Sequence, residues 1–353
     1  MQHPRCCKKC CIWLHGVACK RLGSSPALAG VGMIAMIFAT RVRNRGRFFV
    51  FASEIAMAKA RAIVKRRKAV RNIRKITKTM QMIATARFQR SLKRATGTKP
   101  YTQKVRELVR ELAASVGNVE HPLLRRPTDE TRTRKVALLV ITSNRGLAGA
   151  YNGSVLRTAA AFIRQQEAAG NKIELYITGR KGASFFQYQK RPIVQRVEVS
   201  DEPRFAQVEP LANRFMDDFI DGKVDSVHVA YMNFVSASTQ KPEVMTLLPL
   251  AGVEGETKKE TQRKGYYAIY EFSPDPKALL DELLPLTVRS ALFQAYLDAT
   301  TSEHVARMVA MKSATDNADK MVKSLTMQYN RARQSQITTE LSEIMGGVEA
   351  MKG

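Results

Sequence analysis

An α/β protein is predicted, in which long helices at the two ends of the chain pair as an antiparallel coiled coil and a domain of alternating strands and helices is inserted between them. Two observations predict this fold class. Both ends of the 353-residue chain are poor in proline and carry apolar residues at steps of 3, 4 or 7, which is the spacing of a coiled-coil seam. The middle alternates short apolar runs with helical segments, a pattern typical of βαβ layering. The expected segments are 1–53, 54–115, 116–273 and 274–353.

The first segment, residues 1–53, has the composition of a removable targeting sequence. It contains nine Lys and Arg residues and no Asp or Glu, and the first acidic residue is Glu54. An acid-free N-terminus with scattered arginines and small apolar residues is typical of an organelle transit peptide. Its apolar stretch, residues 27–39, is shorter than the roughly 20 residues that a bilayer-spanning helix needs,. A membrane anchor or signal peptide, and a retained tail, are the alternatives.

All five cysteines also lie in this segment, at positions 6, 7, 10, 11 and 19. Cys7 and Cys10 form a C-x-x-C pair, but no second pair follows at zinc-finger spacing,. We interpret the cluster as incidental, because cleavage after residue 53 would leave a mature chain without cysteine. Disulfide bonds and thiol switching are then not expected in the mature protein.

The second segment is expected to be a basic helix from Ala56 to about Gly97, with a kink or break at Gly97–Pro100 and further helix over 101–115,. Residues 55–106 contain 17 Lys and Arg residues and no acid. A narrow apolar stripe on this helix is expected to face a partner helix. Its members are Ile63, Val70, Ile73, Thr77, Met80, Ala84, Phe88 and Leu92.

The third segment is expected to be a Rossmann-like βαβ domain. Three strands are predicted from short apolar or alternating runs, over Val136–Thr142, Lys172–Thr178 and Ser226–Tyr231,. Two helices are predicted between them, over Asn152–Ala169 and Pro210–Asp221. An additional edge strand is predicted over Pro242–Leu250, and a polar loop over 251–264.

The last segment is predicted to be one helix that opens at Pro274-Asp275-Pro276 and has no proline after Pro285. At about 1.5 Å per residue, its roughly 70 uninterrupted residues make a rod on the order of 100 Å, which we expect a partner to bury. Residues 275–353 carry nine basic and ten acidic side chains, so the positive charge of the mature chain is concentrated on the first helix. The predicted seam is Leu283, Leu286, Phe293, Leu297, His304, Met308, Met311, Thr315, Ala318, Val322 and Leu325.

The turn Ser143–Asn152 follows a predicted strand and opens a helix, where a phosphate-binding turn would stand,. It carries only G-x-x-G, at Gly146 and Gly149, and Gly179–Gly182 lacks the full Walker pattern,. We therefore favour a strand-to-helix turn or docking surface over a nucleotide site. A Rossmann-type enzyme remains the alternative, and dinucleotide binding in calorimetry would identify it.

No catalytic, cofactor-binding or metal-binding residue is identified. The histidines outside the first segment, His121, His228 and His304, stand in three different contexts. We expect His228 to be a core residue with satisfied hydrogen bonds and His304 to lie on the seam. No His/Cys cluster has metal-ligand spacing, and no nucleophile motif is present,.

The basic helix leaves two classes of partner open. Seventeen positive charges could neutralise many nucleic-acid phosphates,. Aromatic residues are sparse there, however, and the apolar stripe commits the helix to a partner helix. A basic helix can equally face acidic protein loops. A salt-dependent gel shift with the mature chain would support the nucleic-acid alternative.

Several motifs, in order along residues 55–353, resemble the γ subunit of F-type ATP synthases. They are Ile76–Met82, Ser143–Gly149, Leu247–Leu250, Pro274–Leu280, Tyr329–Gln334 and Ile337–Leu341. Asn144 and Ala148 stand where the family usually has an acid and a thiol. The cysteine-bearing insertion of the chloroplast form is absent, so redox gating of that kind is not expected. With this resemblance, the transit segment indicates mitochondria.

The resemblance implies a non-catalytic central rotor shaft that couples proton-driven rotation of the c-ring to the conformational cycle of the catalytic β subunits. The implied partners are the hexamer of α and β subunits, the small central-stalk subunits (δ and ε) and the c-ring. No cofactor and no nucleic acid is implied, and the place is the matrix side of the mitochondrial inner membrane, peripheral to it. Co-purification with α and β subunits would dismiss the nucleic-acid alternative.

By resemblance, Met80, Arg331, Arg333 and Gln334 are expected to contact loops of the β subunits, where guanidinium groups suit carboxylates. The alternative for the arginines is a solvated helix face, and for Met80 it is packing within the seam, which we favour. An apolar tip is expected to turn in an apolar sleeve at the top of the ring. Its residues are Ile337, Leu341, Ile344 and Val348.

Overall fold

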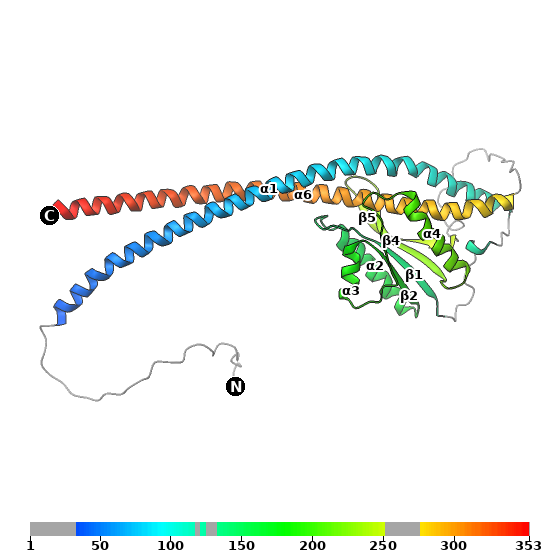
Figure 1. Ribbon diagram of the computed structural model, residues 1–353, viewed down its shortest axis with the longest axis horizontal. Coiled ribbons are helices and arrows are strands. Elements are labelled where there is room, and N and C mark those ends of the chain that lie inside the picture. Colours follow the sequence, from blue (N-terminus) through cyan, green and yellow to red (C-terminus); the bar gives the residue numbers. More distant parts are fainter. Residues whose placement is uncertain (1–32, 117–120, 125–132, 251–275, 353) are drawn as a thin grey trace, which may run out of the picture. The chain divides into compact units, whose positions relative to one another are not determined.

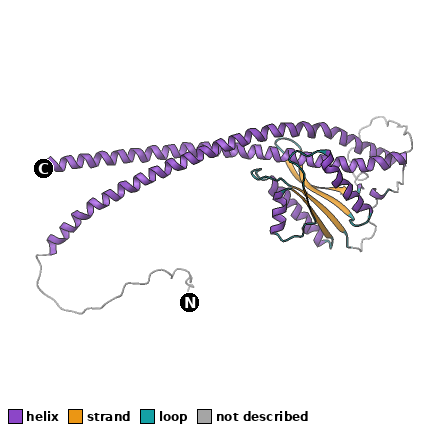
Figure 2. Ribbon diagram, viewed as in Figure 1, coloured by secondary structure: helices purple, strands orange, loops and turns teal. Residues whose placement is uncertain are grey.

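The computed structural model describes residues 33–116, 121–124, 133–250 and 276–352, with side-chain surroundings for 61–109, 121–124, 133–250 and 278–352. Two compact units are distinguished: Ile63–Tyr329, and the described parts of Met1–Ala62 and Asn330–Gly353. Figures 1 and 2 show long helices and a mixed sheet domain. The polar loop expected over 251–264 lies outside the described residues.

The first helix, α1, runs without a break over Met33–Val116. It begins well before Ala56, and the kink or break expected at Gly97–Pro100 is wrong, because Pro100 lies inside the helix. Proline removes one N–H bond from a helix, but α1 is held on both sides of it by the buried side chains of Ala95 and Val105. The hydroxyl of Thr98 also bonds to the carbonyl of Arg94 at 2.9 Å. Packing therefore outweighs the local cost.

The last helix, α6, runs over Pro276–Lys352 and contains Pro285. Its opening at Pro276 and its continuity to the end confirm the prediction. Figure 1 shows α1 and α6 side by side along the sheet domain, and their contact is set by buried residues at a strict seven-residue spacing, as in a coiled coil. On α1 these residues are Val70, Thr77, Ala84 and Ser91, and on α6 they are His304, Met311, Ala318 and Leu325.

Two seam predictions on α1 are wrong. The side chains of Ile73 and Met80 are 52% and 41% exposed. The buried positions next to them carry the small residues Thr77 and Ala84, which allow the helices to approach closely, so longer flanking side chains point outward. Hydrophobic spacing alone did not distinguish the seam from the stripe beside it.

The sheet has the order β3-β2-β1-β4-β5, in which the first four strands are parallel and β5 is antiparallel to β4. Four strands confirm the predicted ones: β1 Lys135–Ile141, β2 Lys172–Thr178, β4 Ser226–Phe234 and β5 Gln240–Leu248. The short edge strand β3, Gln195–Val197, was not predicted. It has three half-buried or exposed residues, so it carries no apolar signal.

Helices cover both faces of this sheet. On one face, α2 (Tyr151–Ala168) and α3 (Arg180–Tyr188) pack against Leu138 and Val140 of β1. On the other face, α4 (Phe205–Ile220) packs against Ala137 and Leu139, together with the first half of α6 and the short 3-10 helix η1 (Pro122–Leu124). Alternate residues of one strand thus serve two cores. The helix predicted from Asn152 is confirmed. The helix predicted from Pro210 is present but begins earlier, at Phe205, and α3 was missed.

The first half of α6 belongs to the core of the sheet domain and is also one of the two helices of the coiled coil. Leu280, Leu284, Val288 and Leu292 are fully buried in the core that α4 shares. Farther along, the hydroxyl of Tyr296 lies 2.7 Å from that of Thr178 at the end of β2. The sheet domain is therefore attached to α6 through apolar packing.

Candidate partner-contact surfaces

Polar contacts reinforce the coiled-coil seam within Ile63–Tyr329. The hydroxyls of Thr77 and Thr315 lie 2.9 Å apart and are buried. An ion pair of 2.5 Å joins Arg74 to Asp319, and the guanidinium of Arg67 lies 4.9 Å from the ring centroid of Tyr329, a cation–π distance,. Two basic residues of α1 are thus used to hold α6.

Other cations on this part of α1 are exposed to solvent. They include Lys65, Arg66, Lys68, Arg71, Lys75 and Lys78. The same stretch carries an apolar stripe with a spacing of 3, 4 and 3 residues, and its members are 41–59% exposed: Ile73, Ile76, Met80 and Ile83. The spacing did not predict this stripe as a surface, because Ile73 and Met80 were placed in the seam; only for Met80 was contact with a partner expected, by resemblance. Apolar and basic side chains side by side suit a protein surface with acidic and apolar groups.

The residues expected at the end of α6 are exposed on one helix. Arg331, Arg333 and Gln334 are all exposed. The four tip residues are between 42% and 64% exposed: Ile337, Leu341, Ile344 and Val348. Large apolar residues exposed in series along a helix are typical of a surface that another protein covers.

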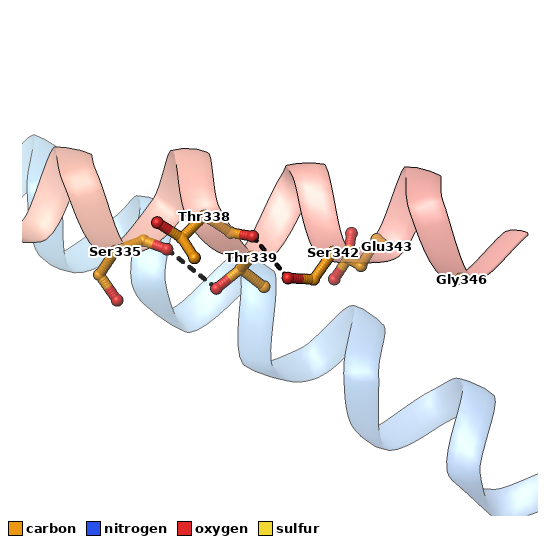
Figure 3. A pocket seen from close by; sticks show the side chains of 6 residues that line it. All are labelled: Ser335, Thr338, Thr339, Ser342, Glu343 and Gly346. Atoms are coloured by element: carbon orange, nitrogen blue, oxygen red, sulfur yellow. Dashed lines mark hydrogen bonds between the residues drawn. The ribbon is translucent and has the colours of Figure 1, made fainter.

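A shallow hollow lies along the same part of α6 (Figure 3) and is lined by small and polar residues. Its lining is Ser335, Thr338, Thr339, Ser342, Glu343 and Gly346. The hydroxyls of Thr339 and Ser342 donate to the carbonyls of Ser335 and Thr338 at 3.0 and 2.9 Å. These hydroxyl groups are satisfied by their own helix.

The turn Ser143–Asn152 is closed by its own hydrogen bonds. The Oδ1 of Asn152 accepts from the backbone N–H of Ser143 at 3.1 Å, and its Nδ2 donates to the Ser143 hydroxyl at 2.8 Å. Leu147 is 68% exposed and has a positive φ of 64°. The turn packs on α6, where a Cβ on Gly149 would lie 3.6 Å from that of Ala310. This arrangement displays a leucine at the surface, which suits the docking interpretation.

The three histidines do not converge. His228 packs on the ring of Phe162, its Nδ1 lies 3.2 Å from the Thr246 hydroxyl, and burial lowers its pKa to about 4. The expected hydrogen bond is thus present, although the ring is only half-buried. His304 lies on the seam as predicted, and burial, followed by Arg307, lowers its pKa to about 4. Within the described ranges, no group of three or more His, Cys, Asp or Glu residues could hold a metal ion.

A further absence concerns the described residues only. None of their helices has an apolar stretch of the length that crossing a bilayer requires. Sequence reasoning also missed three charged residues near the turn: Asp201 and Glu202, which pair with Arg87 and Arg94 of α1, and Arg307, which pairs with Glu303 one turn earlier on α6. For Asp201 and Glu202 the only signal was that two acids stand side by side, because their arginine partners on α1 are distant in the sequence.

Comparison with known proteins gives a consistent result. The family model described as ATP synthase matches residues 59–351. The ATP synthase gamma chain of Rhodopirellula baltica is 42% identical over 299 residues, covering 84% of this chain and all of the relative. That of Leptospira biflexa is 40% identical over 296 residues, with the same coverage.

Solved structures of the Euglena gracilis mitochondrial ATP synthase are similar in fold. The rotor in rotational state 1 matches with a TM-score of 0.52 and 16% identity, covering 79% of this chain and 99% of that one. A chain of the OSCP/F1/c-ring structure in rotational state 3 matches with a TM-score of 0.55 and 18% identity. This match covers 83% of this chain and 95% of that one. With the coiled coil, the inserted sheet and the curated relatives together, the chain belongs to the gamma chain family of ATP synthase, whose members are non-catalytic stalk subunits.

Proposed function

We propose that this chain is the central rotor shaft of a mitochondrial ATP synthase, which couples rotation of a c-ring to the conformational cycle of the catalytic β subunits. The observation that carries the proposal is the exposed end of α6. Arg331, Arg333 and Gln334, followed by an apolar tip, are all exposed on a helix in a chain of the gamma family. A helix with this surface needs a partner that surrounds it.

The seam provides the stiffness that a shaft requires. Buried residues recur every seven positions on both helices, from Val70 to Ser91 and from His304 to Leu325. Continuous heptads keep two helices in contact over their length and resist separation under load. The Thr77–Thr315 hydrogen bond and the Arg74–Asp319 ion pair add directional contacts, which fix the register of the two helices.

Contact with the β subunits is assigned to two surfaces. Arg331, Arg333 and Gln334 present two guanidinium groups and an amide, which suit bidentate hydrogen bonds to loop carboxylates,. Met80 belongs to the exposed apolar stripe of α1, beside exposed lysines. Its 41% exposure supports contact with a partner rather than packing in the seam.

The apolar tip is assigned to a sleeve at the top of the α and β hexamer. Ile337, Leu341, Ile344 and Val348 recur at steps of 4, 3 and 4 and are exposed. Apolar contacts have no preferred direction, so a helix can turn against them without breaking hydrogen bonds. The sheet domain is assigned to the c-ring end of the shaft, with the small central-stalk subunits beside it.

The mitochondrial assignment rests on the first 53 residues. The family match begins at residue 59, and the segment before it has nine basic residues and no acid before Glu54. The ATP synthase gamma chain of Rhodopirellula baltica matches over its full length and covers only 84% of this chain. N-terminal sequencing of the chain from purified mitochondria should begin near residue 54. An intact Met1, or recovery from another compartment, would refute this part of the proposal.

The contact role is tested with the double variant Arg333→Ala/Gln334→Ala in the assembled complex. Loss of these hydrogen bonds should lower ATP turnover several-fold while the α, β and gamma chains still co-purify. A matched control exists in Arg164→Ala/Gln165→Ala, an exposed Arg–Gln pair on α2, which should leave turnover unchanged. Wild-type turnover in the first double variant would remove the role of these two residues.

A further inference from the structure

A charged junction lies where α1, α6 and the sheet domain meet. The two long helices contribute Arg87 and Arg94 of α1 and Glu303 and Arg307 of α6. The sheet domain contributes Asn144 and Arg145 of the turn, and Asp201 and Glu202 of the loop between β3 and α4. All of these residues belong to the unit Ile63–Tyr329. The junction is therefore a described contact within one compact body.

The two long helices are attached to the sheet domain in different ways. From Leu280 to Ala299, α6 is part of the apolar core under the sheet. To that core α1 contributes Val109, and nearer its middle the ring of Phe88 lies 6.2 Å from that of Phe234 on β4. The hydrophobic effect has no preferred direction, whereas an ion pair or hydrogen bond joins two particular atoms. Directional contacts on α1 are therefore informative.

The consecutive acids Asp201 and Glu202 make directional contacts with α1 at two points. Asp201 Oδ2 lies 3.6 Å from Arg87, and Glu202 Oε2 lies 3.5 Å from Arg94. The two arginines are seven residues apart, so they share one face of α1 and are separated by about 10 Å along it. Two consecutive acids thus hold α1 at two points, which opposes both rolling and sliding.

The same aspartate also holds the turn. Asp201 accepts from Asn144 Nδ2 at 3.3 Å and pairs with Arg145 Nε at 3.5 Å. On the opposite side of the turn, Arg307 of α6 donates to the carbonyls of Arg145 and Gly146 at 3.5 and 3.4 Å. Arg307 is in turn fixed by Glu303 at 2.6 Å, and both side chains are largely buried. The turn is thereby tied to both helices.

We infer that Asp201 and Glu202 are positioning residues that make α1 rotate together with the sheet domain, with Asp201 as the centre of the junction. The inference rests on the proposed rotor function. In the ion pairs that Asp201 and Glu202 form, the side chains are 35–66% exposed. Exposed ion pairs contribute little to global stability. Their effect is therefore expected in the torsional stiffness of the shaft and not in its assembly.

The test is single-molecule rotation of the assembled complex with the α and β hexamer fixed to a surface. A probe is attached through Tyr188→Cys, an 88% exposed site on α3, in a chain whose five N-terminal cysteines are replaced by serine. The angular variance of the probe during a pause is inversely proportional to torsional stiffness. Asp201→Asn removes one of two attachment points and should raise this variance up to about twofold. The control Asp217→Asn, at an exposed site on α4, should leave it unchanged.

Charge exchange distinguishes positioning from a general structural role. Glu202→Arg should raise the variance more than Asp201→Asn, because it places two like charges together, and Arg94→Glu in the same chain should restore it. Raising the salt concentration should soften the wild type more than Asp201→Asn, because exposed pairs are screened. Normal rotation with unchanged variance in Asp201→Asn, or no restoration by the exchange, would overturn the inference. Failure of every variant and the wild type to rotate would instead count against the rotor function.

Discussion

Thr77 on α1 and Thr315 on α6, 238 residues apart in the sequence, share a buried hydrogen bond of 2.9 Å between their hydroxyls. Each hydroxyl also lies near a carbonyl of its own helix, that of Arg74 at 3.0 Å and that of Met311 at 2.8 Å. The pair is a polar layer between apolar positions of the seam, such as Val70, Ala84 and Ala318. Polar layers of this kind fix the register of coiled coils.

Thr315→Val should therefore destabilise the seam, because it removes one partner of a buried hydrogen bond, and we expect a loss of about 1 kcal/mol. The measurement is hydrogen exchange of the backbone amides around Thr77 in the assembled complex. Thr77→Val/Thr315→Val should cost less than the sum of the two single changes, since no hydroxyl is left without its partner. Additive losses would show that the two hydroxyls act independently.

The pH dependence of α6 should reveal two opposing buried groups. Burial lowers the pKa of His304 from 6.5 to about 4. As the pH falls from 6.5 to about 4, His304 binds a proton in the unfolded chain but not in the folded chain, so stability is lost,. Burial raises the pKa of Asp298 from 3.8 to about 6, although Gln294 and Lys99 oppose the shift. Here the folded chain binds the proton first, so stability is gained over nearly the same window.

Single variants should separate these effects. Between pH 7 and pH 5, Asp298→Asn should lose more stability than the wild type, by about 1 kcal/mol, because the loss from His304 is no longer offset. His304→Met should avoid a loss of about 2 kcal/mol over the same range. Opening free energies of α6 amides by hydrogen exchange at each pH provide the measurement. If the opening free energies of both variants changed with pH in parallel with those of the wild type, the assigned pKa shifts would be contradicted.

The apolar tip should tolerate changes of shape but not of charge. Leu341→Asp would place a carboxylate in an apolar sleeve without a partner, at a cost of several kcal/mol, so turnover of the assembled complex should fall at least about fivefold. Leu341→Met should remain close to wild type, because it keeps the apolar character. Ile220→Asp, at a 51% exposed site on α4, is the control. Equal turnover in Leu341→Asp and the wild type would mean that solvent surrounds the tip.

Gly179 is a position where only glycine fits. Its φ is +93°, and a Cβ there would lie 2.2 Å from the carbonyl oxygen of Thr142. Gly179→Ala should cost at least about 3 kcal/mol, through strain and overlap with backbone that cannot move freely. Gly170→Ala is the matched control, because its φ is +80° but no atom lies within 4 Å, so about 1 kcal/mol is expected. Soluble yield and thermal melting by circular dichroism would compare them, and equal melting temperatures would contradict the argument.

The long elements could be predicted because local signals are strong and repeated. The strand Lys172–Thr178 is predicted with its observed bounds, since an apolar run between polar segments has few alternatives. By contrast, β3 and α3 were missed, because three residues of weak pattern and a nine-residue helix carry little signal. The helix through Pro100 could not be predicted either, since neighbours from elsewhere in the chain offset the local cost of proline.

Among the candidate site residues, the prediction placed Arg331, Arg333 and Gln334 on the last helix but could not decide their surroundings. For Met80 the favoured interpretation was seam packing, whereas its side chain is 41% exposed. A stripe with steps of 3 and 4 can be either a seam or the surface next to it. The choice depends on which stripe the partner helix approaches most closely, and that approach is set by small residues such as Ala84.

The sequence by itself determined the two proline-poor helices, the alternation of strands and helices between them, and the concentration of positive charge on the first helix. These features follow from spacing and composition, which act over a few residues. Only the tertiary structure decided that α6 is shared between the coiled coil and the sheet core, and that Asp201 meets Arg87 and Arg145. Contacts between residues so distant along the chain depend on how whole elements pack, and no local pattern records that packing.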